Sequence, residues 1–170
     1  MLQNIKQKRQ EGFTIIEVLI VLAIAGLIMV VVFLAVPALQ RNGRNNSLNT
    51  DANNLLSAVG EYAANNNGKL PNALLAAYAA GDDSSTLVDS GITTENQQKV
   101  TLGGNFKALT INNTTTATVS ATSDAGTAEI IKGVKCNGTG VTTSGASARS
   151  YVILYVAEGS GGPVVKCVGS

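Results

Sequence analysis

The sequence predicts an α+β fold, in which one long N-terminal α-helix packs on a C-terminal antiparallel β-sheet of four to five strands. Three observations support this prediction. Residues 18–36 carry no charge, and residues 48–63 place apolar side chains at helical spacing. From Lys107 onward, runs of β-forming residues are separated by Gly, Asn, Ser and Thr. The 170 residues suffice for one domain beyond the helix.

The apolar segment has the length of a membrane span. At about 1.5 Å per residue, a helix over residues 18–36 is roughly 28 Å long, close to the ~30 Å hydrocarbon core of a bilayer. Glu17 stands at its front edge. A charge inside hydrocarbon costs at least about 2.5 kcal/mol, and no cation lies within one helical turn of Glu17. Glu17 therefore needs a partner that is made by processing or brought by another molecule.

The residues before this segment form a short positive leader, residues 1–12, with charges at Lys6, Lys8, Arg9 and Glu11. A secretory signal peptide would be cut after its apolar run, in a small-residue context. The sequence after Val36 begins with Pro37 and fits that context poorly. The bond between Gly12 and Phe13 is the better cleavage site. Cutting it would free an α-amine on Phe13, four residues from Glu17.

Residues 12–26, Gly-Phe-Thr-Ile-Ile-Glu-Val-Leu-Ile-Val-Leu-Ala-Ile-Ala-Gly, resemble the class III leader and N-terminal helix of type IV pilins and pseudopilins. The resemblance implies that a membrane-bound prepilin peptidase cuts after Gly12 and N-methylates Phe13. It also implies that Glu17 pairs with the Phe13 amine of a neighbouring subunit. The apolar helices then leave the membrane and form the core of a helical filament.

The chain departs from the family pattern in one respect. The family usually has a helix-kinking proline at the position of Leu34, whereas here the proline is Pro37. Gly26 stands where the family commonly has glycine. Proline inside a helix costs about 3 kcal/mol and glycine about 1 kcal/mol relative to alanine. We therefore expect the helix to be flexible between Gly26 and Pro37.

The resemblance implies a structural subunit of a type IV pilus, serving adhesion, twitching motility or DNA uptake. The expected location is the bacterial inner membrane for the precursor and the extracellular pilus for the mature protein. The expected partners are further copies of the chain, the prepilin peptidase and the pilus assembly machinery, with a host surface or DNA also possible. Two alternatives remain: a pseudopilin of a type II secretion or competence machine, and a monomeric membrane-anchored binding domain.

The composition argues against an enzyme and predicts neither a cofactor nor a metal site. The chain has no His, which excludes Ser-His-Asp and Cys-His catalysis and His-containing metal sites. Its two Cys cannot supply a Cys₄ zinc site, and Asp82-Asp83 lies in a turn-like context. The 12 Lys and Arg nearly balance the 11 Asp and Glu, so no strong electrostatic signature for nucleic acid is present.

The predicted organisation has four parts: leader 1–12, apolar helix 13–39, amphipathic helix 40–67 and a globular β-rich head 68–170. Arg41 and Arg44 are the first cations after the apolar segment and favour the membrane interface. The stripe of the amphipathic helix is Leu48, Ala52, Leu55, Leu56, Val59, Tyr62 and Ala63. The amphipathic helix is expected to end at the segment Asn65–Gly68, which Pro71 follows. A continuous helix from Thr14 to Asn65 would be about 78 Å long.

Within the head, residues 74–80 are Ala-rich and predict one or two helical turns. The candidate strands are residues 109–111, 117–121, 130–134, 151–156 and 164–168. The Thr-, Ser- and Asn-rich stretches 112–127 and 137–149 predict loops or edge strands.

Two cysteines in an exported chain most simply pair, so we predict a disulfide between Cys136 and Cys167. It would enclose the strand at 151–156 and contribute roughly 3–4 kcal/mol on the chain-entropy account. Its place near the C-terminus also resembles the disulfide-bounded region of many pilins. A metal-binding or reactive thiol pair is the alternative.

Overall fold

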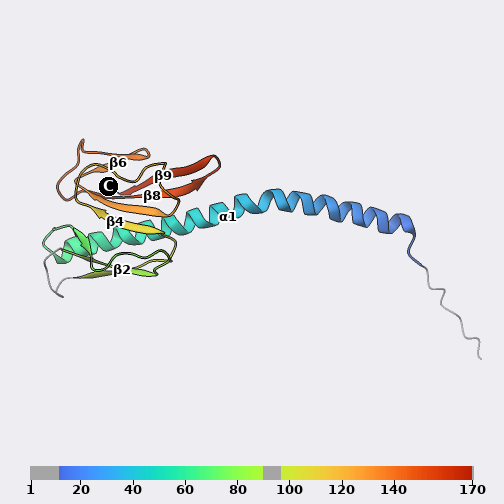
Figure 1. Cartoon of the computed structure of the whole chain (residues 1–170), viewed down its shortest axis with the longest axis horizontal. Helices are drawn as coiled ribbons and strands as arrows, with labels where there is room; N and C mark the ends of the chain where they lie inside the picture. The colour runs from blue at the N-terminus through green and yellow to red at the C-terminus, as the bar shows by residue number, and fades with distance from the viewer. Residues whose placement is uncertain (1–11, 90–96, 170) are drawn as a thin grey trace, which may run out of the picture. The chain divides into compact units, whose positions relative to one another are not determined.

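The computed structural model describes residues 12–89 and 97–169 of the chain. It divides into two compact units, Met1–Gln40 and Arg41–Ser170. The leader charges at Lys6, Lys8, Arg9 and Glu11 lie outside the described residues. Within the described residues, one long helix, α1, is followed by nine strands (Figure 1).

Helix α1 runs from Ile15 to Asn65, which confirms the predicted helix and its end. Asn67 and Gly68 follow it with positive φ angles of 55° and 80°. The Gly68 N–H donates to the Ala63 carbonyl at 2.7 Å, the bond that defines a Schellman termination. The chain ends the helix here because asparagine and glycine tolerate the left-handed conformation that this termination requires.

The strands form three sheets. The first is antiparallel in the order β1-β2-β3, with β1 at Ala73–Leu74, β2 at Ser84–Val88 and β3 at Gln98–Thr101. The second has the order β4-β5-β8-β9, with β4 at Ala108–Asn112, β5 at Thr127–Lys132, β8 at Tyr151–Gly159 and β9 at Gly162–Gly169. The third pairs β6, Lys135–Asn137, with β7, Gly140–Thr142.

The predicted α+β class is confirmed, and four predicted strands correspond to β4, β5, β8 and β9. The predicted strand at residues 117–121 is wrong, because this segment is irregular. The sheet is also not wholly antiparallel, since β4 and β5 run parallel in register from Ala108 with Thr127. Parallel neighbours need a long connection, and residues 113–126 supply one.

The predicted helical turns at residues 74–80 are wrong as well. The backbone N–H groups of Asn72 and Leu75 donate to the carbonyls of Val88 and Thr86, at 3.0 and 2.9 Å. These bonds hold the start of the segment extended beside β2. Pairing in the sheet thus outweighs the weak helical preference of alanine.

One apolar core joins the second half of α1 to both larger sheets. Five of the predicted stripe residues are buried, and Asp51 and Ala58 are buried beside them. Leu87 and Val100 of the first sheet and Ile130 and Ile153 of the second lie in the same cluster. In Figure 1 the helix accordingly passes between β2 and β4.

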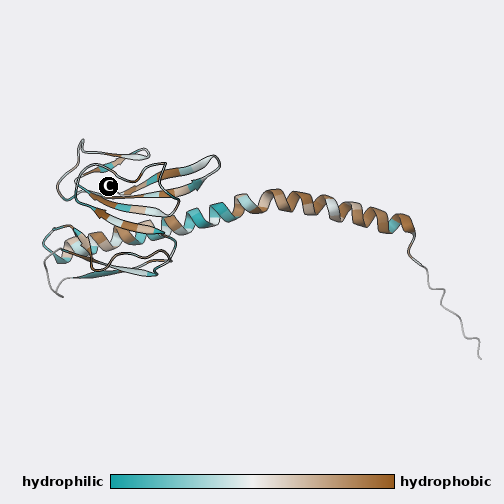
Figure 2. Ribbon diagram, in the orientation of Figure 1, coloured by the Kyte–Doolittle hydropathy of each residue, from teal (hydrophilic) through white to brown (hydrophobic). Residues whose placement is uncertain are grey.

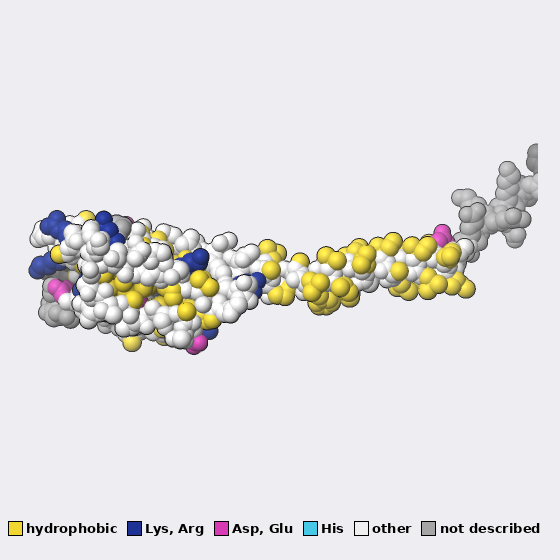
Figure 3. Space-filling model, turned by 90° about the horizontal axis from the view of Figure 1, so that it is seen from above, with side chains coloured by type: hydrophobic (Ala, Val, Ile, Leu, Met, Phe, Trp, Pro, Cys, Tyr) yellow, Lys and Arg dark blue, Asp and Glu magenta, His cyan; other side chains and the backbone are white. Residues whose placement is uncertain are grey.

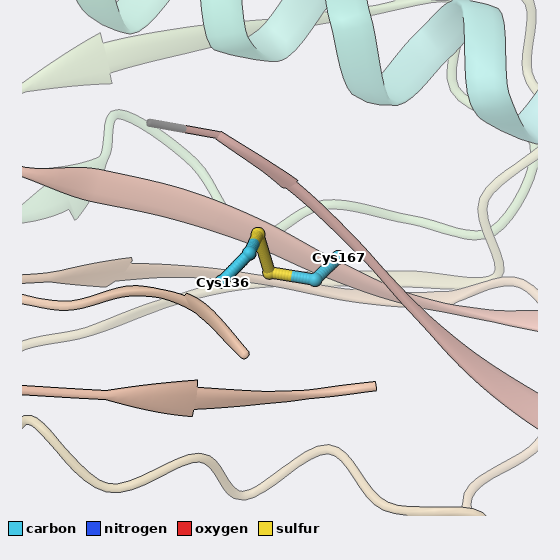
Figure 4. Close-up of a disulfide and its surroundings, with 2 residues drawn as sticks. All are labelled: Cys136 and Cys167. Carbon is cyan, nitrogen blue, oxygen red and sulfur yellow. A yellow bond between two sulfur atoms is a disulfide. The ribbon is translucent and has the colours of Figure 1, made fainter. Parts of the chain in front are cut away.

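Strand β8 is buried on both faces, which its continuous run of apolar residues, Val152–Ala157, explains. Ile153 and Tyr155 belong to the core with α1. Val152, Leu154 and Val156 belong to a second cluster on the other face. The disulfide between Cys136 and Cys167 joins β6 to β9 beside this second cluster. Figure 4 shows the bond between the two sulfur atoms. Its presence confirms the predicted pairing.

Candidate functional site

The first turn of α1 carries a reciprocal hydrogen-bonded cap between Thr14 and Glu17. The Thr14 N–H and hydroxyl donate to Glu17 Oε2 at 3.0 and 2.8 Å. The Glu17 N–H donates to Thr14 Oγ1 at 3.3 Å. This is a capping box, in which the side chains of the N-cap residue and of the third helical residue satisfy each other's backbone N–H groups.

The cap gives Glu17 two hydrogen-bond donors within its own chain. The carboxylate also lies in the first turn of the helix, where the helix dipole favours negative charge. Neither donor is a cation, so the cap orients the carboxylate without neutralising it. The spacing Thr-x-x-Glu before an apolar run is the sequence signature of a capping box. Thr14 and Glu17 carry that signature in this sequence, so the cap could have been predicted from these two residues.

Gly12 and Phe13 precede α1 and are exposed. The Phe13 side chain is 88% exposed, so the bond between the two residues lies outside regular structure and away from packed side chains. Phe13, Glu17, Val18, Val21 and Leu22 line one shallow hollow at the start of the helix. The residues that sequence reasoning connected, Phe13 and Glu17, therefore face the same local surface.

Residues 18–36 present an exposed apolar surface around the whole helix. Their large side chains are between 39% and 77% exposed, from Val36 to Leu34. Hydrophobic residues dominate this part of α1 in Figure 2 and cover its visible face in Figure 3. Within the described residues, α1 is the one helix long and apolar enough to cross a membrane. A surface of this size normally marks a membrane or protein interface.

Gly26 and Pro37 both lie inside α1, which continues through them. A Cβ added at Gly26 would meet no atom within 4 Å, so no packing contact requires glycine there. Pro37 cannot donate the backbone hydrogen bond that a helix interior normally makes. Glycine and proline both reduce the intrinsic stability of the helix between residues 26 and 37. The flexibility expected there stays a prediction.

Polar contacts fasten the tip of the β8–β9 hairpin to α1. Arg44 Nε and Nη2 donate to Glu158 Oε1 and Oε2 at 2.7 and 2.6 Å. Asn45 Nδ2 donates to the Glu158 carbonyl, and the Glu158 N–H donates to Asn45 Oδ1, both at 2.8 Å. The hydrogen bond from Arg44 lowers the pKa of the Glu158 carboxyl. Arg44, predicted at a membrane interface, thus has a partner inside the second unit.

Asp51 and Glu129 are buried carboxylates that organise loops with neutral donors. Asp51 Oδ1 accepts the Gly103 N–H at 2.6 Å, and Oδ2 accepts from the Asn105 side chain at 2.9 Å. Glu129 accepts the Val119 N–H at 3.1 Å. These contacts give both carboxylates a structural role. Asp82 lies in an exposed turn, where its Oδ2 accepts the Ala79 N–H at 2.8 Å.

The comparisons with known proteins concern the N-terminal segment. Residues 7–33 match the family model described as the prokaryotic N-terminal methylation motif. No curated protein and no solved structure matches the chain significantly. The matched segment contains Gly12, Phe13, Thr14 and Glu17 and most of the exposed apolar helix. This chain therefore carries the prokaryotic N-terminal methylation motif, the signature of a class III prepilin leader.

Proposed function

We propose that this chain is the precursor of a surface-filament subunit, a type IV pilin, which polymerises through the apolar half of α1. The leader signature implies processing by a prepilin peptidase and assembly into a multi-subunit filament. In the proposal, cleavage falls between Gly12 and Phe13, the new Phe13 amine is N-methylated, and the precursor resides in the bacterial inner membrane. The mature protein resides in the extracellular pilus.

The observation that carries the proposal is the exposed apolar helix with a carboxylate at its leading edge. The exposed side chains of residues 18–36 need either lipid or other apolar helices around them. A simple membrane anchor would gain nothing from Glu17, which costs at least about 2.5 kcal/mol where hydrocarbon surrounds it. A filament core supplies both an apolar environment and a cationic partner. Glu17 therefore favours assembly over anchoring.

The geometry of the cap suggests how the carboxylate meets that partner. Both bonds from Thr14 end on Glu17 Oε2. Among the described residues no hydrogen bond is made to Oε1, which leaves this oxygen for a further donor. Cleavage after Gly12 preserves the Thr14 N–H, so the mature subunit keeps the cap. We infer that Thr14 orients Glu17 and that the Phe13 amine of a neighbouring subunit binds through Oε1.

The amine of the same chain is a weaker partner. Four residues of helical rise separate Phe13 from Glu17 by about 6 Å along the axis. Phe13 also precedes the first helical residue, Ile15, and its amine would have to compete with the Thr14 donors on the same side. A neighbour's amine can approach from outside the helix. Such a pair would also fix the axial offset between subunits.

The test is to express Glu17→Ala with Glu61→Ala as the matched control, since Glu61 is an exposed carboxylate of the same helix. We expect Glu17→Ala to be inserted and cleaved but to form few or no filaments. Leaving the Phe13 amine buried without a partner costs about 3–5 kcal/mol per subunit. Glu61→Ala should form filaments like the wild type. Electron microscopy of sheared filaments and mass spectrometry of their subunits provide the measurements.

Normal filaments from Glu17→Ala would refute the assembly role. Subunits that retain residues 1–12 in filaments would refute the processing step. The same micrographs distinguish a pilus from a pseudopilin fibre, because a pilin makes abundant long filaments and a pseudopilin short ones. A monomeric anchored protein would yield no filaments from the wild type.

A further inference from the structure

A basic depression lies at the end of the second unit where α1 terminates. It has a volume of about 500 Å³, and three of its lining residues are Lys69, Lys132 and Arg149. Lys69 follows the helix end, Lys132 closes β5, and Arg149 precedes β8. Figure 3 shows Lys and Arg side chains gathered at one end of this unit. Three segments that are distant in sequence thus bring cations to one concave surface.

No salt bridge joins these three cations to an acid in the part of the chain that the structure describes. The ion pair found there joins Arg44 to Glu158, outside the depression. The acid in the lining is Asp89, whose Oδ1 accepts a hydrogen bond from Asn72 Nδ2. Lys132 is half-buried, and burial lowers the pKa of its ammonium, an effect that Asp89 partly opposes. Lys69 and Arg149 are exposed. The depression therefore carries a surplus of positive charge, of which the Lys132 ammonium is partly removed from water.

The Arg149 side chain passes close to the backbone of Gly68. A Cβ on Gly68 would lie 2.8 Å from Arg149 Nε, and Gly68 also has a left-handed φ of +80°. Gly133, on the other side, donates its N–H to the Ser150 carbonyl at 2.7 Å and so fixes the residue after Arg149. The guanidinium consequently lies close over the end of the helix, where a side chain at position 68 would displace it.

We propose that this depression binds a sulfate or phosphate ester carried by a saccharide. Guanidinium and ammonium groups are the usual partners of tetrahedral oxyanions, and arginine can bind two of their oxygens at once. The volume is in the range of small-ligand sites. The Asp89 carboxylate can accept a hydrogen bond from a hydroxyl beside the ester, as a sugar ring provides.

The lining favours a saccharide over a nucleic acid. Proteins that hold single strands usually stack bases on aromatic side chains. The described lining of this depression contains no aromatic residue. Recognition here would rest on charge and hydroxyl contacts, which an anionic sugar satisfies without stacking. Nucleic acid binding is therefore an outcome against the proposal.

A purely structural role makes a different prediction. Cations near a helix C-terminus stabilise the helix by interacting favourably with its dipole. If Lys69 and Arg149 served only this purpose, their loss would lower the melting temperature and change no binding. The test therefore needs a binding measurement beside a stability measurement on the same variants.

The experiment titrates the detergent-solubilised full chain with three probes: a heparin oligosaccharide, a phosphorylated mannan oligosaccharide, and a single-stranded DNA of equal charge. Desulfated heparin and dephosphorylated mannan are the controls. We expect at least one ester-bearing saccharide to bind and its ester-free form not to bind. Lys132→Ala and Arg149→Ala should each weaken that binding about tenfold or more, because each removes a charged hydrogen-bond donor.

Lys99→Ala and Lys166→Ala are the matched controls, because both lysines are exposed and lie outside the depression. They should change the affinity by no more than about twofold. Equal losses from all four variants would overturn the proposal, as would equal binding of DNA or absence of binding to both ester-bearing saccharides. Variants that melt earlier yet bind normally would assign the cations to the helix end instead. The sulfated and phosphorylated probes decide which ester is preferred.

Discussion

Replacing Glu129 by alanine is expected to destabilise the second unit by about 3–5 kcal/mol, because four donors lose one common acceptor. Glu129 is 1% exposed. Its Oε1 accepts from Asn112 Nδ2 at 2.7 Å and from Thr118 Oγ1 at 2.6 Å. Its Oε2 accepts the N–H groups of Thr118 and Val119 at 3.0 and 3.1 Å. The carboxylate thereby holds the irregular segment around residue 118 against β5.

The size of this loss of stability depends on whether each donor can form a hydrogen bond with water once the carboxylate is removed. Val119 is buried, so its N–H would lose about 1–3 kcal/mol. The other three donors are nearer the surface and would lose about 0.5–1 kcal/mol each as water replaces the carboxylate. For a unit of this size, the sum corresponds to a fall in melting temperature of roughly 10–20 °C. The result should be visible in a simple thermal melt.

Glu129→Gln should cost less, about 1–3 kcal/mol, and the difference tests the geometry. Glutamine keeps one acceptor oxygen but places an amide NH₂ where the other oxygen was. If the oxygen faces the two backbone N–H groups, the NH₂ faces Thr118 Oγ1, whose hydroxyl can turn to accept. Asn112 cannot adapt as easily, because its Oδ1 already accepts from the N–H and hydroxyl of Thr114.

The assay is thermal and urea unfolding of the detergent-solubilised chain, with Asp124→Ala as an exposed carboxylate control that should change stability by less than about 0.5 kcal/mol. Hydrogen exchange at the Val119 amide adds a local measurement, since this N–H should exchange much faster in Glu129→Ala. An alanine variant that melts with the wild type would refute the reasoning. A glutamine variant as stable as the wild type would show that the donors do not distinguish oxygen from nitrogen.

Three further predictions concern the rest of the chain. Mature subunits should begin at N-methylated Phe13, and a bulky residue in place of Gly12 should leave uncut precursor. Mass spectrometry measures both outcomes, and wild-type subunits that retain residues 1–12 would contradict the prediction. Thiol labelling of the native protein should find neither Cys136 nor Cys167 free, and Cys136→Ala should lower stability by about 2–4 kcal/mol in urea unfolding without affecting leader cleavage. The hydrogen bond from Arg44 lowers the pKa of Glu158 in the folded state. The stability that Glu158 contributes is therefore complete above the pKa of this carboxyl in the unfolded chain, and it is lost as the pH falls through the pKa in the folded state. Wild type should thus lose more stability than Glu158→Gln between about pH 5 and pH 3, and parallel pH curves for the two would contradict the pairing.

The helix and the two longest strand runs were predictable because their signals are local and strong. An uncharged segment, a helical stripe and the Asn-Asn-Asn-Gly termination define α1 almost to the residue. The run Val152–Ala157 is apolar throughout and becomes the doubly buried β8. The disulfide followed from the two cysteines of a chain that the sequence predicts to be exported. In the helix and in these strands, residues that are close in the sequence favour the observed secondary structure, and tertiary contacts stabilise it further.

The first sheet was not predictable by the same reasoning. Strand β3, Gln98–Thr101, has one buried residue in an alternating pattern too short to stand out. Strand β1 is two residues long and exists because β2 pairs with it. Its neighbours are alanines, whose intrinsic preference is helical. Such strands are defined by partners far along the chain, so a local reading finds no signal.

The segment 117–121 shows the opposite error, a local signal that tertiary contacts override. Its alternation of Thr, Val and Ser suits a strand. In the fold, the N–H groups of Thr118 and Val119 both donate to the Glu129 side chain, where a strand would use them for a ladder. A buried carboxylate with no cation beside it needs such donors. Because Glu129 needs hydrogen-bond donors, it determines the conformation of a loop ten residues earlier in the chain.

The same principle applies at the N-terminus, where Thr14 and Glu17 satisfy each other. In the sequence, Glu17 stands out as a charge without a cationic partner, and cleavage after Gly12 would supply such a partner as the Phe13 amine. The structure adds that the carboxylate is held by two Thr14 donors on one oxygen. A charge already oriented loses little conformational freedom when an amine binds it. In the proposed filament, the capping residues would therefore favour assembly for the same reason that they start the helix, because they fix the carboxylate at the helix end before another subunit binds.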